Sequence, residues 1–220
     1  MNKFNKFLSL CFQFICGLMI IKNSFAADDK FTHPFYVGAT GGYGSTTWSG
    51  LVPNDDNQNL AMSLSTPIKV TEGGAIWGAF GGYEFNKFFA LEASYNKYQD
   101  AKIEFDEISI FNFEHDGLTE FTTRTETVTL VGKVMLVIPK TDIRLFSSTG
   151  VAAVRRQDII YNDWRATPTF GAGLNYNITP RIMTEFGANY TAGYGEAQLS
   201  PTDSYLPFLY SIFFRLGLRF

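Results

Sequence analysis

The chain has 220 residues, which suits one domain or at most two, and a closed all-β barrel can occupy all of it. It contains 20 Gly, 22 Phe, 11 Tyr and 3 Trp, and only 18% of its residues are charged, a profile too aromatic and too rich in glycine for a helical bundle. Together with a net charge of −3, these figures exclude a disordered chain, a collagen, a disulfide scaffold and a nucleic-acid-binding protein.

The N-terminus has the layout of a secretory signal peptide. Lys3 and Lys6 precede an apolar run over residues 7–21, which ends at the small, bulky, small sequence of residues 24–26. The run is short and contains a glutamine, so it does not suit a membrane-spanning helix. We predict a signal peptide over residues 1–26 and a mature barrel domain over residues 27–220.

After this segment, apolar residues alternate with other residues in eight stretches. At the C-terminus every second residue from Tyr210 to Phe220 is apolar, whereas Arg215 and Arg219 lie on the opposite face. Each stretch is near the roughly 9–11 residues that a strand needs to cross a bilayer at a tilt. The predicted strands are residues 35–43, 77–85, 89–96, 128–136, 143–153, 170–177, 182–190 and 210–220.

The connections between these strands alternate in length. Residues 86–87, 139–142 and 179–180 read as tight turns, whereas the segments near 46–74, 99–122, 155–167 and 191–208 are long. Short turns on one side and long loops on the other are typical of an outer-membrane barrel with its turns in the periplasm. We therefore predict an all-β fold, an eight-stranded antiparallel up-and-down transmembrane β-barrel with long extracellular loops.

The composition of the two alternating faces indicates which of them meets lipid. The polar faces are rich in Gly, Ser and Asn, which suit the narrow interior of an eight-stranded barrel. Aromatic residues fall at both ends of the apolar faces, where the interfacial girdles of a lipid-embedded barrel lie. The turn-end girdle would comprise Phe35, Phe85, Phe89, Tyr176 and Phe220, and the loop-end girdle Tyr43, Trp77, Tyr95, Phe170, Tyr190 and Tyr210. A soluble barrel would place the apolar faces inward and would not explain this placement.

The charges on the predicted interior faces nearly balance, as buried charges require. They are Glu84, Glu92 and Glu185 against Lys133, Arg144, Arg215 and Arg219. Bulky side chains on the same faces leave no room for a wide aqueous pore. We predict a charge network that plugs the barrel, in a structural or gating role. Small conductance through rearranged ion pairs, or lateral passage of an apolar solute, is the alternative.

Two short motifs resemble a known family. Gly-Tyr-Glu-Phe-Asn at 82–86, followed by Phe-Ala-Leu-Glu at 89–92 and Tyr95, resembles the second hairpin of small outer-membrane barrels related to the transmembrane domain of outer-membrane protein A, a group that includes opacity-type surface proteins. Gly-Ala-Gly-Leu-Asn-Tyr at 171–176 is similar to the same group. The resemblance implies a Gram-negative outer membrane, with membrane lipid, lipopolysaccharide and the barrel insertion machinery as partners.

The C-terminal residues resemble the assembly signal that this insertion machinery reads. The residues concerned are Phe214, Leu216, Leu218 and Phe220. The chain ends at Phe220, so we do not expect the peptidoglycan tethering of relatives that carry a further periplasmic domain.

Enzymes built on this architecture depend on a histidine near a serine or a carboxylate. Of the two histidines, His33 precedes the first strand and His115 lies beside Glu114 and Asp116, with Ser109 nearby. Both cysteines fall inside the predicted signal peptide, and two distant histidines cannot furnish a structural zinc site. We therefore expect no catalytic residue, no metal site and no cofactor.

The second long connection is acidic. It carries Asp100, Glu104, Asp106, Glu107, Glu114, Asp116 and Glu120 against Lys102. This charge would attract cations, set the choice of partner, or only keep the loop soluble. The leading hypothesis is a non-catalytic integral outer-membrane barrel with a structural or adhesin-like surface-interaction role through its loops, for which host or phage surface molecules are candidate partners. The alternative is a narrow channel or a conduit for apolar solutes.

Overall fold

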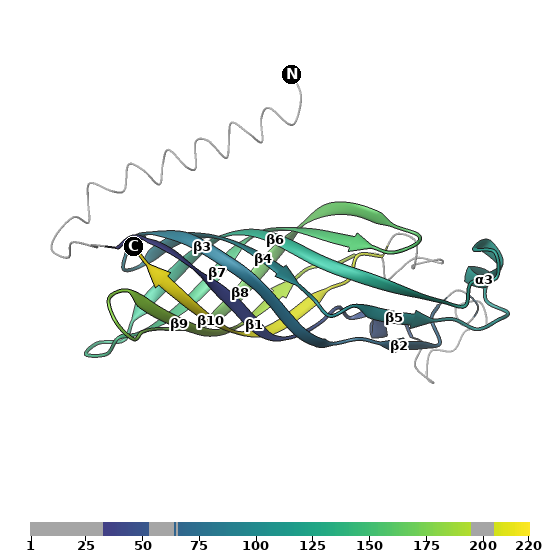
Figure 1. Ribbon diagram of the computed structural model, residues 1–220, viewed down its shortest axis with the longest axis horizontal. Coiled ribbons are helices and arrows are strands. Elements are labelled where there is room, and N and C mark those ends of the chain that lie inside the picture. The colour runs from purple at the N-terminus through teal and green to yellow at the C-terminus, as the bar shows by residue number, and fades with distance from the viewer. Residues whose placement is uncertain (1–32, 53–63, 65, 195–204) are drawn as a thin grey trace, which may run out of the picture. The chain divides into compact units, whose positions relative to one another are not determined.

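The computed structural model describes residues 33–52, 64, 66–194 and 205–220. The predicted signal peptide lies outside these residues. Eight antiparallel strands close into a barrel in the order β1-β3-β4-β6-β7-β8-β9-β10, and β10 pairs back with β1 (Figure 1). This confirms the predicted eight-stranded up-and-down barrel.

The strands of the barrel contain the predicted ranges, except that Phe220 lies one residue beyond the last strand. They are β1 (Phe35–Ser45), β3 (Gly74–Asn86), β4 (Phe89–Lys97), β6 (Glu120–Val137), β7 (Ile143–Gln157), β8 (Asn162–Asn177), β9 (Ile182–Thr191) and β10 (Leu209–Arg219). The remaining elements are η2 (Trp48–Leu51), β2 (Lys69–Thr71), β5 (Ala101–Glu104) and α3 (Ile110–Glu114). Neither of the described helices is long and apolar enough to cross a membrane.

The apolar faces of the barrel strands point outward and the polar faces point inward. In β10, for example, Ile212, Phe214 and Leu216 are exposed, whereas Phe213 and Arg215 are buried. The predicted girdle aromatics all lie on the outward face, exposed or half-buried. This inversion of the usual protein core is what a barrel surrounded by hydrocarbon requires, because its exterior solvent is apolar.

The three predicted tight turns are present at one end of the barrel. The Asn86 side chain closes the first of them, because its Oδ1 accepts hydrogen bonds from the backbone N–H groups of Phe88 and Phe89 at 2.8 and 3.0 Å. In the second, Lys140 adopts a left-handed conformation with φ of 62°. The first and last barrel strands begin and end beside these turns (Figure 1).

One segment predicted to be a long loop is mostly strand. β7 and β8 remain paired far beyond their predicted ends, so only residues 158–161 connect them, not residues 155–167. Asp158 closes this turn by accepting hydrogen bonds from the backbone N–H groups of Ile160 and Tyr161 at 2.9 and 2.8 Å. The prediction was wrong because this part of the hairpin is mostly polar on both faces, so no apolar alternation marks it.

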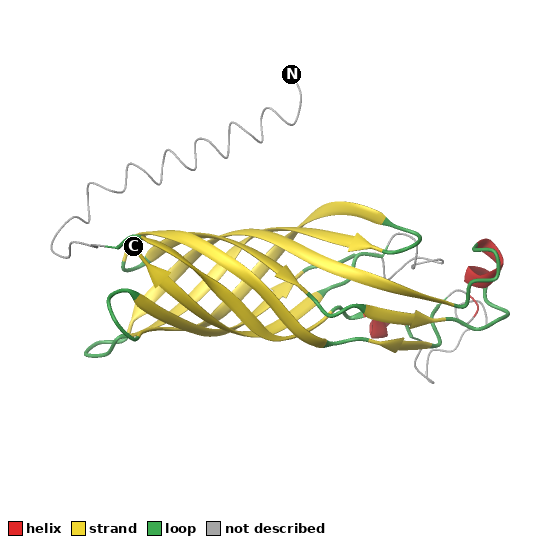
Figure 2. Cartoon of the chain, in the orientation of Figure 1, coloured by secondary structure: helices red, strands yellow, loops and turns green. Residues whose placement is uncertain are grey.

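Two other predicted loops also contain regular structure. β6 begins at Glu120, inside the predicted second loop, and β5 pairs with its first residues. β2, from the first long connection, pairs with β5. The three strands form an extension beyond the loop end of the barrel, with α3 at its far end (Figure 2).

Candidate functional site

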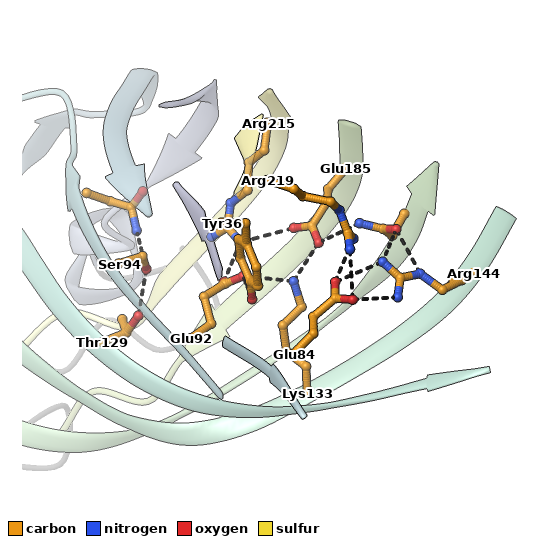
Figure 3. A network of polar contacts seen from close by, with 12 residues as sticks. Tyr36, Glu84, Glu92, Ser94, Thr129, Lys133, Arg144, Glu185, Arg215 and Arg219 are labelled. Carbon is orange, nitrogen blue, oxygen red and sulfur yellow. Dashed lines mark hydrogen bonds and ion pairs between the residues drawn. The ribbon is translucent and has the colours of Figure 1, made fainter. Parts of the chain in front are cut away.

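The charged residues predicted for the interior are buried and lie together inside the barrel (Figure 3). Each points into the barrel, while its neighbours along the strand point outward, because successive side chains of a strand point to opposite faces. Each is within 3.4 Å of an oppositely charged member. The members are Glu84, Glu92, Lys133, Arg144, Glu185, Arg215 and Arg219, and we call them the interior network.

In this network Glu84, on β3, binds two guanidinium groups. Arg144 on β7 donates from Nη1 and Nη2 to the two carboxylate oxygens at 3.1 and 2.9 Å. Arg219 on β10 donates in the same way at 2.9 and 2.6 Å. Bidentate arginine–carboxylate pairs are strong and fixed in orientation. Glu84 therefore joins two strands that are not its neighbours in the sheet.

The second part of the network is a ring of two carboxylates and two cations. Lys133 Nζ donates to Glu92 at 2.9 Å and to Glu185 at 2.6 Å. Arg215 Nη1 donates to Glu92 at 2.7 Å and lies 3.4 Å from Glu185. Each carboxylate thus contacts both cations, which offsets the cost of removing four charges from water.

Two uncharged residues that the sequence did not single out complete the network. The Tyr36 hydroxyl donates to Glu92 at 3.0 Å. Asn175 Oδ1 accepts from Arg144 Nη2 at 2.7 Å, and its Nδ2 donates to Glu185 at 3.1 Å. With Tyr36 on β1 and Asn175 on β8, every strand of the barrel contributes a member. The alternation of the strands places both residues on the inward face, which was the available signal in the sequence. A neutral side chain does not require a charged partner, however, so neither was expected in the network.

Aromatic side chains lie against Lys133 and Arg215, the two cations of this group of four charges. Lys133 Nζ lies 4.4 Å from the centre of the Phe146 ring. The Arg215 guanidinium lies 4.2 Å from Phe213 and 4.9 Å from Phe80. Cation–π contacts of this kind are strongest where water is excluded, so the aromatic side chains both fill the lumen and stabilise the two buried cations.

Between the network and the loop end, polar side chains line a cavity of about 20 Å³, which is room for about one water molecule. The Ser94 and Thr129 hydroxyls beside it lie 2.6 Å apart. On the other side Asn189 Nδ2 donates to Thr169 Oγ1 at 3.1 Å. These hydroxyl and amide groups thus surround a water-sized cavity, not a wide pore.

Beyond the loop end, the connections pack into a hydrophobic core of their own, which we call the cap. Its buried members are Trp48, Leu51, Ala101, Ile103, Phe105, Phe111, Phe121 and Tyr205. They come from the first, second and fourth long connections. The rings of Phe105 and Phe111 stack at 3.9 Å, and those of Trp48 and Tyr205 meet edge to face at 4.7 Å. The cap is therefore a folded structure and not a set of independent loops.

Arg156, from the β7–β8 hairpin, joins the cap members to one another. Its side chain is fully buried, with Nε 2.6 Å from Asp158 Oδ2 and Nη1 donating to the Tyr205 carbonyl oxygen at 2.9 Å. Its guanidinium also lies 4.7 Å from the Trp48 ring and 5.3 Å from the Tyr161 ring. The buried Arg156 side chain thus links the β7–β8 hairpin to the β1–β3 connection, which carries Trp48, and to the β9–β10 connection, which carries Tyr205.

Glu72 fixes the first connection. Its Oε2 accepts from the Thr46 hydroxyl at 2.9 Å and from the Trp48 backbone N–H at 2.7 Å. Its Oε1 accepts from the Ser49 backbone N–H at 3.0 Å and from the Ser49 hydroxyl at 2.6 Å. Four hydrogen bonds to one carboxylate hold η2 against the segment between β2 and β3, and so place Trp48 in the cap.

The acidic second connection distributes its charges unevenly. Glu120 accepts from Lys102 at 2.7 Å, and this hydrogen bond raises the pKa of the Lys102 ammonium group. Glu104 lies 3.4 Å from Lys69 on β2 and 3.6 Å from Lys102. The other carboxylates near α3 are exposed and form no ion pair with a described residue. They are Asp106, Glu107, Glu114 and Asp116.

The residues of the predicted assembly signal lie on the outward face at the end of the chain. Phe214, Leu216, Leu218 and Phe220 are all exposed there. Phe220 also exchanges backbone hydrogen bonds with Phe35 at 2.9 and 3.3 Å, and the two rings stack at 6.3 Å. Phe220 therefore belongs to the seam where β10 meets β1.

The serine and the histidine considered for catalysis are engaged locally. The Ser109 hydroxyl accepts from the Asn112 backbone N–H at 3.1 Å, and His115 Nδ1 lies 2.9 Å from the Phe111 carbonyl oxygen. The His115 ring stacks on Phe111 at 4.2 Å. The two side chains do not hydrogen-bond to each other. Among the described residues, no group of three or more His, Cys, Asp and Glu is placed to hold a metal ion.

A closed barrel with an apolar exterior, aromatic girdles and a buried set of paired charges defines a small transmembrane β-barrel protein. A family model for the OmpA-like transmembrane domain matches residues 31–220. The chain therefore belongs to the OmpA-like family of outer-membrane barrels, in agreement with the resemblance of its motifs. No curated protein matches the chain.

Several solved barrels are similar to this chain at low identity. The N-terminal barrel domain of Pseudomonas aeruginosa OprF is 12% identical over 86% of this chain and 98% of its own, with a TM-score of 0.49. Ail, the attachment invasion locus protein of Yersinia pestis, is 16% identical over 85% and 99%, with a TM-score of 0.42. Neisserial surface protein A is 10% identical over 84% and 97%, with a TM-score of 0.48.

Proposed function

We propose that this barrel is a non-catalytic surface protein whose interior network closes the lumen and whose cap is an adhesin-like surface for molecules outside the cell. The cap carries this proposal, because its hydrophobic core joins described residues of three connections into one packed surface. A pre-organised surface loses little conformational entropy on binding, which favours recognition. Host or phage surface molecules are the partners that such a surface would meet.

The interior network supports the closed lumen in this proposal. A permeating ion would have to displace the four hydrogen bonds of Glu84 and the ring formed by Lys133 and Arg215. Refolded mature protein in a planar bilayer should therefore show no discrete openings. Openings that Arg215→Ala alters would favour the narrow channel instead.

A trimmed variant tests the surface role. Short turns replace the connections β1–β3, β4–β6 and β9–β10, while the membrane strands and the interior network stay intact. Bacteria that display the full protein should bind host cells or adsorb phage, and bacteria that display the trimmed barrel should not. A heat-dependent gel shift of both proteins controls for folding. Equal binding by the two strains would contradict the surface role.

The proposal includes export through the signal peptide and insertion into membrane lipid and lipopolysaccharide. Removal of residues 1–26 would leave a mature chain that begins at Ala27. N-terminal sequencing of protein isolated from outer membranes tests this. An N-terminus at Met1 would contradict it.

A further inference from the structure

The helix α3 lies at the end of the cap farthest from the turns (Figure 1), and large apolar side chains on it and just before it are exposed. Ile108, Ile110 and Phe113 are 76%, 41% and 89% exposed, and we call them the tip patch. Ile110 and Phe113 are three residues apart on α3 and so share one of its faces. The patch lies beyond the lipid-facing strands, where hydrocarbon does not explain its exposure. Exposed apolar patches on folded proteins commonly mark interaction sites.

The tip patch is held in place from behind. Phe111, on the other face of α3, is buried and stacks on Phe105 at 3.9 Å and on Phe121 at 5.6 Å. The Ser109 hydroxyl caps the helix, and Gly117 continues the chain in a left-handed conformation with φ of 86°. Ile110 and Phe113 therefore form the outer face of a packed helix, and Ile108 lies just before its capping serine, where its backbone N–H donates to Asp106 Oδ1 at 3.1 Å. The helix side chains cannot turn into the cap core without removing Phe111 from it.

Negative charge flanks the tip patch along the chain. Residues 105–119 contain no Lys or Arg, and the four exposed carboxylates among them form no ion pair with a described residue. They are Asp106, Glu107, Glu114 and Asp116. Like charges at a shared interface are unfavourable, so this rim opposes contact between two copies of the tip and contact with an anionic surface.

We infer that the tip patch binds a protein partner through a basic amphipathic segment. Apolar side chains of the partner would cover Ile108 and Phe113, while its Lys and Arg side chains would meet the four carboxylates. This inference rests on the proposed surface role, for which it names the site and the chemistry of the partner. Complementary charge around an apolar centre is the usual arrangement of a specific interface.

The test uses mature protein in nanodiscs of zwitterionic phosphatidylcholine and a helical peptide of Leu and Lys. A matched peptide with Glu in place of each Lys controls for charge, and empty nanodiscs control for lipid binding. We expect saturable binding of the Lys peptide only, weakened by added NaCl because exposed charges are screened. The double variant Ile108→Ser, Phe113→Ser should weaken binding at least about tenfold. Ile159→Ser removes an exposed apolar side chain from the β7–β8 turn and should change nothing.

Four results would overturn the inference. Equal binding of the two peptides would remove the charge argument, and unchanged binding by the double variant would place the site elsewhere. A dimer in analytical ultracentrifugation that the double variant abolishes would assign the patch to a second copy of the chain. Failure of the surface role itself is distinguishable, because a double variant that loses the peptide but still adheres to cells contradicts only this inference.

Discussion

Glu84 is the central residue of the first part of the interior network, which also contains Arg144 and Arg219. Its carboxylate lies between Arg144 and Arg219, and each arginine donates to both of its oxygens. Removing one partner of a buried ion pair is costly because it leaves an uncompensated charge in a medium of low polarity. Here the loss would take one carboxylate away from two buried guanidinium groups at once.

We therefore expect Glu84→Gln to lower the free energy of unfolding by about 3 kcal/mol. Urea unfolding of the mature barrel in detergent micelles, followed by tryptophan fluorescence, measures this. Glu126→Gln is the matched control, since the Glu126 carboxylate has a 3.9 Å ion pair with the half-buried Arg155 and a hydrogen bond with the Tyr95 side chain that a glutamine can keep; its effect should stay below about 1 kcal/mol. If the two variants lose equal amounts of unfolding free energy, the two bidentate pairs of Glu84 add no stability.

The sequence predicted which charged residues face the interior of the barrel, but it could not predict which of them pair with each other. Alternation places a charged residue on the inward face, because the lipid outside and the packed lumen inside impose opposite polarity on successive residues. Glu84, however, pairs with β7 and β10 across the lumen, and those contacts depend on the stagger between strands. Asn175 was missed for the same reason, since only its position between Arg144 and Glu185 reveals its role.

At the scale of elements, the sequence predicted the membrane strands well and the cap poorly. Within the bilayer one face of each strand must be apolar, so the period is visible. In the first half of β6 the buried face is instead Phe121 followed by Thr123, Thr125 and Thr127, and the outer face is charged. Both faces are then polar for most of their length, and the β-branched threonines at every second position were the available sign of a strand.

The cap elements should depend on Arg156. Arg156→Leu would leave Asp158 buried without its cation and would remove the hydrogen bond to the Tyr205 carbonyl oxygen. Loss of one partner of such a pair costs about 3–5 kcal/mol, which should open the cap and raise the rate of proteolysis within it at least tenfold. The barrel strands should stay protected, because their network is separate from this residue.

Limited proteolysis with mass spectrometry of the fragments measures this effect. Arg124→Leu is the control, since Arg124 is exposed and its contact with Asp100 is 3.8 Å long. If the two variants are cleaved at the same rate, Arg156 does not hold the cap together. Cleavage inside the barrel strands of the Arg156 variant would show that cap and barrel unfold as one unit.

For the whole molecule, closure of the barrel and the predicted recognition by the insertion machinery involve the same residue. Phe220 completes the seam through its backbone hydrogen bonds with Phe35, and its ring belongs to the predicted assembly signal. In hydrocarbon an unpaired backbone group costs several kcal/mol, so deletion of Phe220 would affect both closure and recognition. Phe220→Ala keeps the backbone pairs and removes only the ring.

We predict that Phe220→Ala reduces insertion in cells but leaves refolding in vitro nearly unchanged, because refolding into detergent does not use the machinery. Surface labelling and the amount of unfolded periplasmic chain measure insertion, and the heat-dependent gel shift measures refolding. Phe170→Ala removes another exposed ring, from the loop-end girdle, and controls for the loss of an interfacial aromatic. Equal defects in both assays would mean that the stacked ring serves closure of the seam, and normal insertion would refute the assembly signal.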